Sequence, residues 1–367
     1  MDLLSAVSNV WDKTVAGSLA DLRRMPRELV EAGPNATLYR YLPLESAAVH
    51  DGPPVLLVPP LGAPDFAYDL RRGCSLVEHL LAGGRRVYLV DYGAISFAER
   101  GLGLEFWVDT VVPRVVEQVA RDTAGDPRRP DGADRDGGPG VDLVGWCLGG
   151  VFSLLAAAAR PALPIRSIAV VATPFDVSSV PLVAPLRPLA AITGGRVVSS
   201  IYQAAGSIPA PVVRWAFQLS TVDKYLTKPL TVLSRLDDRD VLEQIEAVDY
   251  LMSHMHGYPG RTFGQIYHLM LRSNDLADGG LALGGRRVAL SEVKVPVLVV
   301  AGENDVIAPL DAVSRGVGLL TGAPEVRFES APGGHLGVLT GRRARDTTWA
   351  YLDRFLDTTP AGDSGAR

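Results

Sequence analysis

Short, continuously hydrophobic runs recur along the chain and alternate with longer segments in which hydrophobic residues have helical spacing. The runs predict strands at residues 37–42, 55–58, 87–91, 141–145, 167–172, 297–301 and 325–329. The intervening segments predict helices at residues 75–81, 104–120, 150–159 and 342–356. Runs that are hydrophobic at every position are typical of parallel strands covered on both faces. The alternating order therefore predicts a doubly wound, mostly parallel α/β sheet.

The alternation breaks in the middle of the chain and at both ends. Residues 173–290 are rich in proline, leucine and aromatic residues but contain no comparable hydrophobic run, so we expect an inserted, mostly helical cap. Hydrophobic spacing over residues 3–24 predicts a leading helix, and the polar, glycine-rich segment 122–140 predicts a mobile surface loop. The expected parts are a helical N-terminal segment (1–36), a core in two pieces (37–172 and 291–357), the cap (173–290) and a disordered tail (358–367).

Composition narrows the class of protein further. With 367 residues and 47% hydrophobic content, the chain can fill a large core. A net charge of −5 offers no basic stripe for a phosphate backbone, so we expect no nucleic-acid partner. The hydrophobic runs are far shorter than the roughly 18 residues of a membrane span. Two cysteines and no signal-peptide pattern favour a reducing cytoplasm.

The sequence Gly145-Trp146-Cys147-Leu148-Gly149-Gly150 lies between a predicted strand and a predicted helix. Small residues around a nucleophile allow the sharp strand-to-helix turn called a nucleophile elbow, and here cysteine stands in the place of serine. N–H groups at the start of the following helix favour a thiolate or an oxyanion. The alternative is a structural cysteine, but two glycines would then follow it without any turn that needs them. We therefore predict an α/β-hydrolase fold with Cys147 as nucleophile.

The catalytic order of this fold is nucleophile, acid, histidine, and both remaining groups are present. Asp305 follows the strand predicted at 297–301, and His335 lies in a glycine-rich turn after the last predicted strand. In this arrangement the acid orients the imidazole, which takes the thiol proton. Glu303, earlier in the same loop as Asp305, is the alternative acid. The prediction is a triad of Cys147, His335 and Asp305.

An acyl-transfer site also needs N–H donors for the developing oxyanion. We expect one from Leu148 and a second from the turn after the first core strand, at Leu61 or Gly62. His254 and His256 have no third ligand at a usual spacing, so no metal site is expected. No organic cofactor is expected either, because the chemistry needs only the triad and the substrate's own thioester.

The choice of cysteine bears on the reaction. Attack of a thiolate on a thioester exchanges one thioester for another with little change in free energy, so the acyl group stays activated for transfer to an alcohol. A serine would lose that activation in an oxygen ester. Cysteine therefore favours acyl transfer from a thiol carrier, while hydrolysis remains open.

An ordered set of segments resembles the polyhydroxyalkanoate synthases, most closely the short catalytic subunit of the two-component (class III) enzymes. The likeness covers nearly the whole chain and lies in residues 55–60, 68–70, 87–93, 145–150, 171–176, 224–226, 283–287, the Asp305 loop and 333–337.

This resemblance implies that Cys147 accepts a 3-hydroxyacyl group from coenzyme A, with release of CoA at each addition. It implies His335 as general base and Asp305 as an aid in activating the 3-hydroxyl of the incoming unit. It also implies a cap that gates the substrate channel, a second, non-catalytic subunit, a homodimer, and association with a polymer granule surface.

Three other functions remain open. A relative of the synthases could transfer a single acyl group to a small molecule, and an intracellular polyester depolymerase or thiol hydrolase could share the fold. A non-catalytic, granule-associated scaffold is the alternative from a different class. A scaffold has no use for a strained elbow, so the presence of nucleophile, acid and histidine argues against it.

Overall fold

The computed structural model describes residues 2–44, 52–125, 140–180, 207–219 and 229–359. An eight-stranded sheet in the order β1-β2-β4-β3-β5-β6-β11-β12 forms the core. From β4 to β12 neighbouring strands run parallel, whereas β2 is antiparallel to both β1 and β4. The strands are β1 (Arg27–Gly33), β2 (Ala36–Tyr41), β3 (Pro54–Val58), β4 (Arg86–Asp91), β5 (Val141–Trp146), β6 (Ile165–Val171), β11 (Val297–Gly302) and β12 (Val326–Ala331).

All seven predicted strands are present, and the parallel sheet confirms the predicted fold class. The strand β1 was not predicted, because its sequence is polar and its side chains are half-buried or exposed. It lies at the edge of the sheet and pairs only with β2. An edge strand of this kind lacks the hydrophobic run that marks a central strand.

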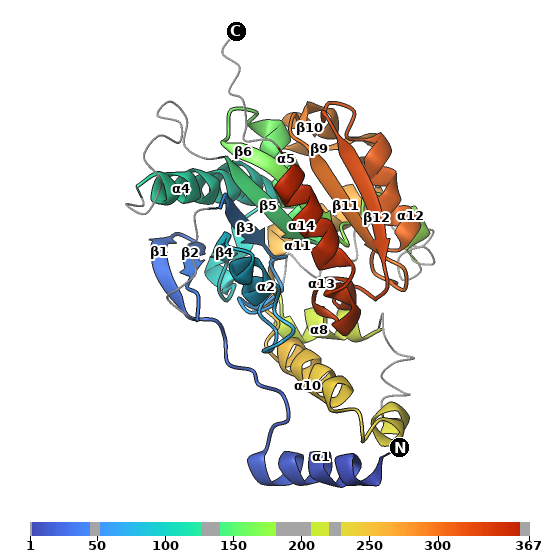
Figure 1. The fold of residues 1–367 in the computed structure, drawn as a ribbon. Coiled ribbons are helices and arrows are strands. Elements are labelled where there is room, and N and C mark those ends of the chain that lie inside the picture. Colours follow the sequence, from blue (N-terminus) through green and yellow to red (C-terminus); the bar gives the residue numbers. More distant parts are fainter. Residues whose placement is uncertain (1, 45–51, 126–139, 181–206, 220–228, 360–367) are drawn as a thin grey trace.

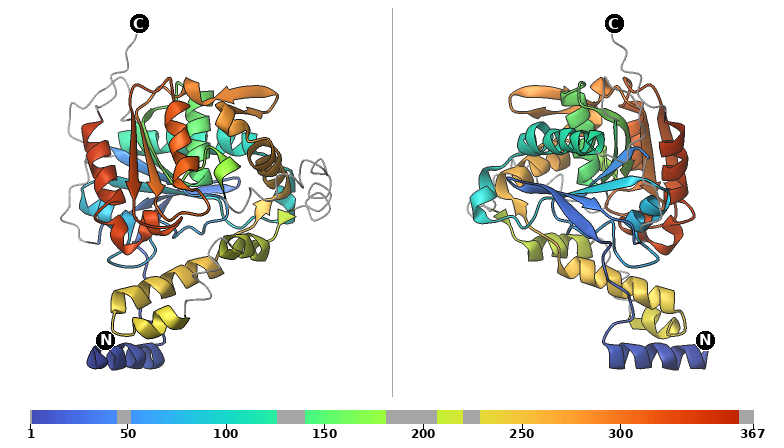
Figure 2. Two further views of the ribbon diagram at one scale, coloured as in Figure 1. Left: turned by 90° about the vertical axis from the view of Figure 1, so that its right-hand side faces the viewer. Right: turned by 60° about the vertical axis from the view of Figure 1, so that its left-hand side comes forward.

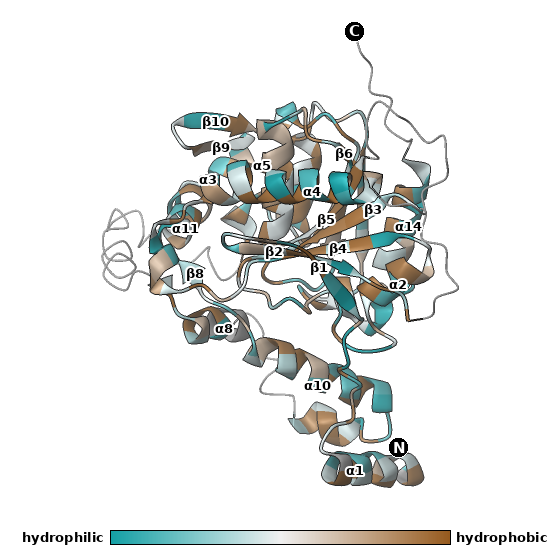
Figure 3. Ribbon diagram, turned by 90° about the vertical axis from the view of Figure 1, so that its left-hand side faces the viewer, coloured by the Kyte–Doolittle hydropathy of each residue, from teal (hydrophilic) through white to brown (hydrophobic). Residues whose placement is uncertain are grey.

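Helices cover both faces of the sheet (Figures 1 and 2). One face carries α4 (Val112–Ala124) and α5 (Leu148–Ala159), and the other carries α2 (Leu76–Ala82) and α14 (Thr348–Thr358). Between the two layers, β3 and β5 are buried at every position, and β3 is mostly hydrophobic (Figure 3). No helix in the described ranges is long and apolar enough to cross a membrane.

The predicted helix at 104–120 is interrupted in a way that anchors the cap. It consists of α3 (Leu104–Phe106), a π-helical turn (Trp107–Val111) and α4. Within the π turn, the buried Trp107 donates its indole N–H to the Thr262 hydroxyl at 2.9 Å. This bond ties the core to α11 (Gly260–Gln265) of the cap.

The described cap residues are mainly helical, with a hairpin that was not predicted. The helices are α8 (Ala210–Leu219), residues 229–234, α10 (Arg239–Ser253), α11 and a π-helical segment (Ile266–Arg272). The short strands β7 (Ser207–Ile208) and β8 (Tyr258–Pro259) pair, and β9 (Gly280–Leu283) forms the hairpin with β10 (Arg286–Ala289). That hairpin packs against α5 of the core. Residues 181–206 and 220–228 of the predicted cap, most of the predicted loop and the tail from 360 lie outside the described residues.

The leading helix α1 (Leu3–Ala16) is shorter than predicted, because Gly17 ends it in a left-handed conformation with φ 76°. It packs on α10 of the cap at the end remote from the sheet (Figure 1). Lys13 pairs with Glu246 at 2.8 Å, and the same carboxylate accepts the Leu19 N–H at 2.9 Å. The N-terminal segment thus extends the cap.

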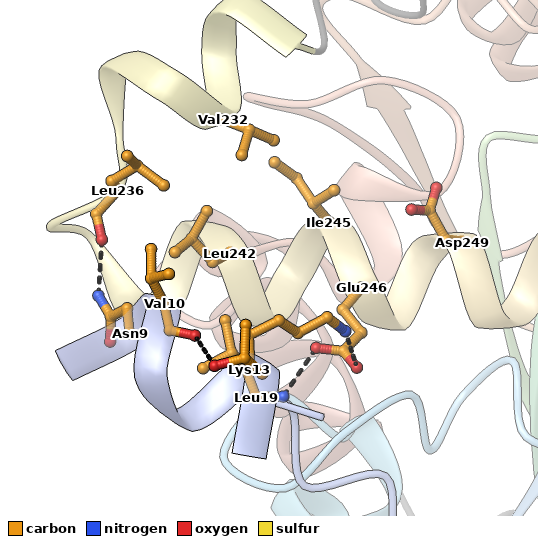
Figure 4. Close-up of a pocket in the computed structure, with 11 residues that line it drawn as sticks. Asn9, Val10, Lys13, Leu19, Val232, Leu236, Leu242, Ile245, Glu246 and Asp249 are labelled. Atoms are coloured by element: carbon orange, nitrogen blue, oxygen red, sulfur yellow. Dashed lines mark hydrogen bonds and ion pairs between the residues drawn. The ribbon is translucent and has the colours of Figure 1, made fainter. Parts of the chain in front are cut away.

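A cavity of about 420 Å³ lies between α1 and α10 (Figure 4). Its lining is mostly apolar, and the Lys13–Glu246 pair lies at its side. The lining residues are Asn9, Val10, Lys13, Thr14, Leu19, Val232, Leu236, Leu242, Ile245, Glu246 and Asp249. None of the predicted site residues is among them.

A buried ion pair fixes the strand that leads to Cys147. Asp142 on β5 accepts the Arg166 Nε–H at 2.9 Å and the Ser167 hydroxyl at 2.6 Å. Arg166 also donates to the carbonyls of Leu356 and Thr359, at 3.0 and 2.7 Å. The pair therefore joins β5, β6 and the end of α14.

Arg166→Leu is expected to lower the free energy of unfolding by about 3–5 kcal/mol, because it leaves the Asp142 carboxylate buried without its partner. Urea denaturation followed by circular dichroism measures the loss. The control is Arg327→Leu, whose pair with Glu325 is partly exposed, at 35% and 47% of the two side chains, and should contribute less than about 1 kcal/mol. Equal losses in the two variants would contradict this view of the buried pair.

Candidate active site

Cys147 occupies the turn between β5 and α5 in a conformation that non-glycine residues rarely adopt. Its φ is 54° and its ψ is −122°. Such a backbone costs about 1–3 kcal/mol and persists only where surrounding structure enforces it. The side chain is half-buried against the core, and the Cys147 N–H donates to Val171 of β6 at 3.0 Å. The geometry is that of a nucleophile elbow.

The glycines around Cys147 are required by close approach of the backbone. A Cβ at Gly149 would lie 2.0 Å from the Val58 carbonyl oxygen at the end of β3. At Gly150 it would lie 2.1 Å from the Thr173 hydroxyl, and at Gly145 it would lie 2.5 Å from the Gly150 Cα. The turn therefore needs Gly149 and Gly150. The alternative of a purely structural cysteine gave no reason for these two glycines.

Asp305 and His335 lie together at the ends of β11 and β12. Asp305 Oδ2 and His335 Nδ1 are 2.8 Å apart, and both side chains are buried. Asp305 Oδ1 accepts the N–H groups of Ile307 and Ala308 at 2.8 and 2.9 Å, which fixes the carboxylate. Glu303 is exposed on the same loop. Of the two candidate acids, the structure thus places Asp305, and not Glu303, beside His335, as predicted.

Backbone bonds hold the acid loop against the histidine loop. The Asn304 N–H donates to Gly333 at 2.9 Å, and the Glu303 N–H donates to Ala331 at 3.0 Å. Gly333 has φ 145°, and a Cβ there would lie 2.7 Å from the Val338 nitrogen. A glycine is needed at this position to bring the two loops together.

Charge links His335 to Cys147. Burial alone would lower the pKa of His335, but the negative charge of a Cys147 thiolate and that of Asp305, with hydrogen bonds to both, raise the pKa to about 10. The imidazolium form is therefore favoured beside Cys147.

Sequence reasoning missed a role for Trp146. Its indole N–H donates to the His335 backbone carbonyl at 3.0 Å, and the two rings lie 5.5 Å apart. Trp146 thus ties the elbow directly to the histidine loop. Its position beside the nucleophile was the one available signal, but nothing in the sequence indicates a partner 189 residues away.

The predicted oxyanion donors lie on two neighbouring segments. The Leu148 N–H is at the first position of α5, where helical N–H groups have no intrahelical acceptor. The turn with Leu61 and Gly62 follows β3, whose end contacts Gly149. Tyr68 fixes this edge, because its hydroxyl lies 2.9 Å from the Val58 carbonyl oxygen and 3.0 Å from that of Val144.

The other sulfur and imidazole groups lie elsewhere. Cys74 is buried and its Sγ lies 3.1 Å from the Thr340 carbonyl oxygen, while His254 is exposed on the cap. Across the ranges that the structure describes, no three histidine, cysteine or acidic residues are arranged to hold a metal ion.

Comparison with known proteins found curated relatives that share one name. The chain is 28% identical to the poly(3-hydroxyalkanoate) polymerase subunit PhaC of Allochromatium vinosum, over 90% of this chain and 88% of that protein. It is 24% identical to the protein of the same name from Thiocystis violacea, over 97% and 95% of the two chains. No protein-family model matches.

Among solved structures, a putative non-heme bromoperoxidase, BpoC, from Mycobacterium tuberculosis H37Rv superposes with a TM-score of 0.50. The match covers 84% of this chain and 94% of that one, at 17% sequence identity. At this identity the likeness shows the fold alone. The curated relatives confirm the predicted family resemblance.

Gly149→Ala should destabilise the protein by about 3 kcal/mol and slow alkylation of Cys147 by iodoacetamide, because the new methyl group collides with the Val58 carbonyl. Thermal unfolding and labelling rates report the two effects. Gly101→Ala is the matched control, since a Cβ there meets no atom within 4 Å. Wild-type behaviour of Gly149→Ala would contradict the close approach.

Asp305→Asn should lower the pKa of His335 from about 10 toward its usual 6.5, because it removes one of the two neighbouring negative charges. NMR titration of the histidine rings measures this shift. Glu303→Gln, on the exposed part of the loop, should leave the His335 titration unchanged.

The same shift makes stability depend on pH. The pKa of His335 is raised in the folded state, so protonation of His335 stabilises the folded protein. This contribution to the free energy of unfolding is complete below pH 6.5 and is lost as the pH rises toward 10. The free energy of unfolding should fall over this interval, and fall less in Asp305→Asn. An equal fall in both proteins would contradict the role of Asp305.

Proposed function

We propose that the chain is an acyltransferase of the polyhydroxyalkanoate synthase type, which polymerises 3-hydroxyacyl-CoA thioesters into polyhydroxyalkanoate and releases CoA. Its similarity to the two PhaC subunits supports this proposal. Cys147 carries the growing acyl chain, and His335 and Asp305 complete its triad. The observation that supports this most directly is the strained elbow at Cys147 beside the buried His335–Asp305 pair. No second nucleophilic side chain is needed, because the substrate's own 3-hydroxyl is the nucleophile in chain growth.

Acylation starts from the form in which His335, as imidazolium, already holds the proton of the Cys147 thiol. The thiolate attacks the thioester carbonyl, and the resulting oxyanion accepts hydrogen bonds from the Leu148 N–H and from Leu61 or Gly62. Collapse of the tetrahedral intermediate breaks the bond to the CoA sulfur, which takes the proton from His335. The product is an acyl thioester on Cys147 and free CoA.

Chain growth requires a hydroxyl nucleophile. His335 removes the proton from the 3-hydroxyl of one acyl unit, and that oxygen attacks the thioester carbonyl of another. The C–S bond breaks, and the displaced sulfur takes the proton from His335, so that an ester bond and a free thiol replace a thioester bond and a hydroxyl. Asp305 assists through His335, because its two carboxylate oxygens are engaged by the imidazole and by two backbone N–H groups. Direct contact between Asp305 and the hydroxyl is therefore not part of this mechanism.

The proposed substrate and product indicate where in the cell the protein acts. Acyl-CoA thioesters are cytoplasmic, and an insoluble product would place the enzyme at a granule surface. A homodimer and a second, non-catalytic subunit are part of the same proposal, supported by the family relationship.

The test is CoA release from 3-hydroxybutyryl-CoA by the wild-type protein and Cys147→Ala, with turbidity recorded in parallel. We expect release with turbidity in the wild type and at least a thousandfold less release in the variant, because the acyl group loses its attachment point. Thiol reagent and light scattering provide the two measurements.

Each alternative has its own outcome. Cysteine-dependent release into soluble product would favour hydrolysis or transfer of a single acyl group. Release of monomer from preformed polyester, without CoA turnover, would favour a depolymerase. Granule binding with no effect of alkylating Cys147 would favour a scaffold.

A further inference from the structure

A cap residue, Tyr258, lies over the turn that is expected to supply the second oxyanion donor. A Cβ built at Gly62 would be 2.8 Å from Cε2 of the Tyr258 ring and 3.2 Å from its hydroxyl oxygen. The ring edge and the hydroxyl therefore cover Gly62 at close range. Only a glycine leaves room for the phenol at this position.

The cap holds this ring in place. Tyr258 lies on β8, where it pairs with Ile208 of β7, and it packs against the small cluster of Ile208, Val213 and Met255. Two residues before Tyr258, the His256 N–H donates to the Gly62 carbonyl at 2.9 Å. A backbone hydrogen bond thus joins the cap to the Gly62 turn, and the Tyr258 phenol ring lies against that turn.

The electrostatic surroundings keep the phenol protonated. Burial raises the pKa of Tyr258, and the negative charge of a nearby Cys147 thiolate raises it further, whereas a backbone hydrogen bond with Gly62 acts in the opposite direction. At neutral pH the hydroxyl is therefore a hydrogen-bond donor.

We propose that the Tyr258 hydroxyl donates a hydrogen bond to the substrate carbonyl oxygen as it becomes an oxyanion, beside the N–H group of Leu148, while the Gly62 N–H donates to the Tyr258 oxygen. This deepens the proposed function, since it rests on Cys147 being the nucleophile. The phenol supplies a donor at the place where negative charge develops, and it gives up no proton. Because the donor comes from the cap, acylation of Cys147 depends on the cap being seated on Gly62.

Tyr258→Phe tests this, because it removes the hydroxyl and keeps the ring. Two reactions of Cys147 are compared: the nitrophenol burst with p-nitrophenyl acetate, which passes through an oxyanion, and alkylation by iodoacetamide, which does not. The burst rate constant should fall by about 10- to 100-fold, with the alkylation rate within about twofold of wild type. The control Tyr250→Phe removes a hydroxyl elsewhere in the cap and should change neither rate.

An unchanged burst in Tyr258→Phe would overturn the proposal. A parallel fall in burst and alkylation would also overturn it, because the tyrosine would then be acting through the structure of the site. The proposed function is tested separately by CoA release. If the burst depends on Tyr258 and the wild type releases no CoA from 3-hydroxybutyryl-CoA, the donor role stands and the synthase reaction fails.

Discussion

The conformation of Cys147 is the constraint on which the rest of the site depends. A cysteine with φ 54° is unfavourable on its own, and it is held because β5 and α5 meet at an angle that only glycines at 145, 149 and 150 permit. The same close approach brings the end of β3 against the elbow. One packing constraint thus presents the thiol and places the turn with Leu61 and Gly62 beside it.

The cap is coupled to this centre through a few specific contacts. Trp107 and Thr262 join it to the core helix layer, and His256 bonds to the Gly62 turn. At its far end, α1 is bound to α10 through Glu246. A movement of the cap would therefore shift the Gly62 turn. Because the proposed oxyanion donors lie at this turn, such a movement would change how they are placed around the substrate carbonyl.

Much of this arrangement could be predicted from the sequence. The strands β3, β4, β5, β6 and β11 are buried on both faces, so their hydrophobic runs identify them, and the fixed order of the fold pointed to Asp305 and His335. The edge strand β1 and the hairpin β9–β10 were missed because they are short or partly exposed. Two contacts were missed for a different reason: the Trp146–His335 hydrogen bond and the packing of Tyr258 against Gly62. A local sequence pattern carries no information about contacts between residues so far apart in the chain.

The central claim is that Cys147 carries the acyl group. Intact-protein mass spectrometry after brief exposure to 3-hydroxybutyryl-CoA, followed by peptide mapping, tests it most directly. The account predicts one or more 3-hydroxybutyryl units on the peptide that contains Cys147, removable by hydroxylamine at neutral pH as expected for a thioester. CoA release with the acyl group on another residue, or with the same acyl adduct in Cys147→Ala, would contradict it.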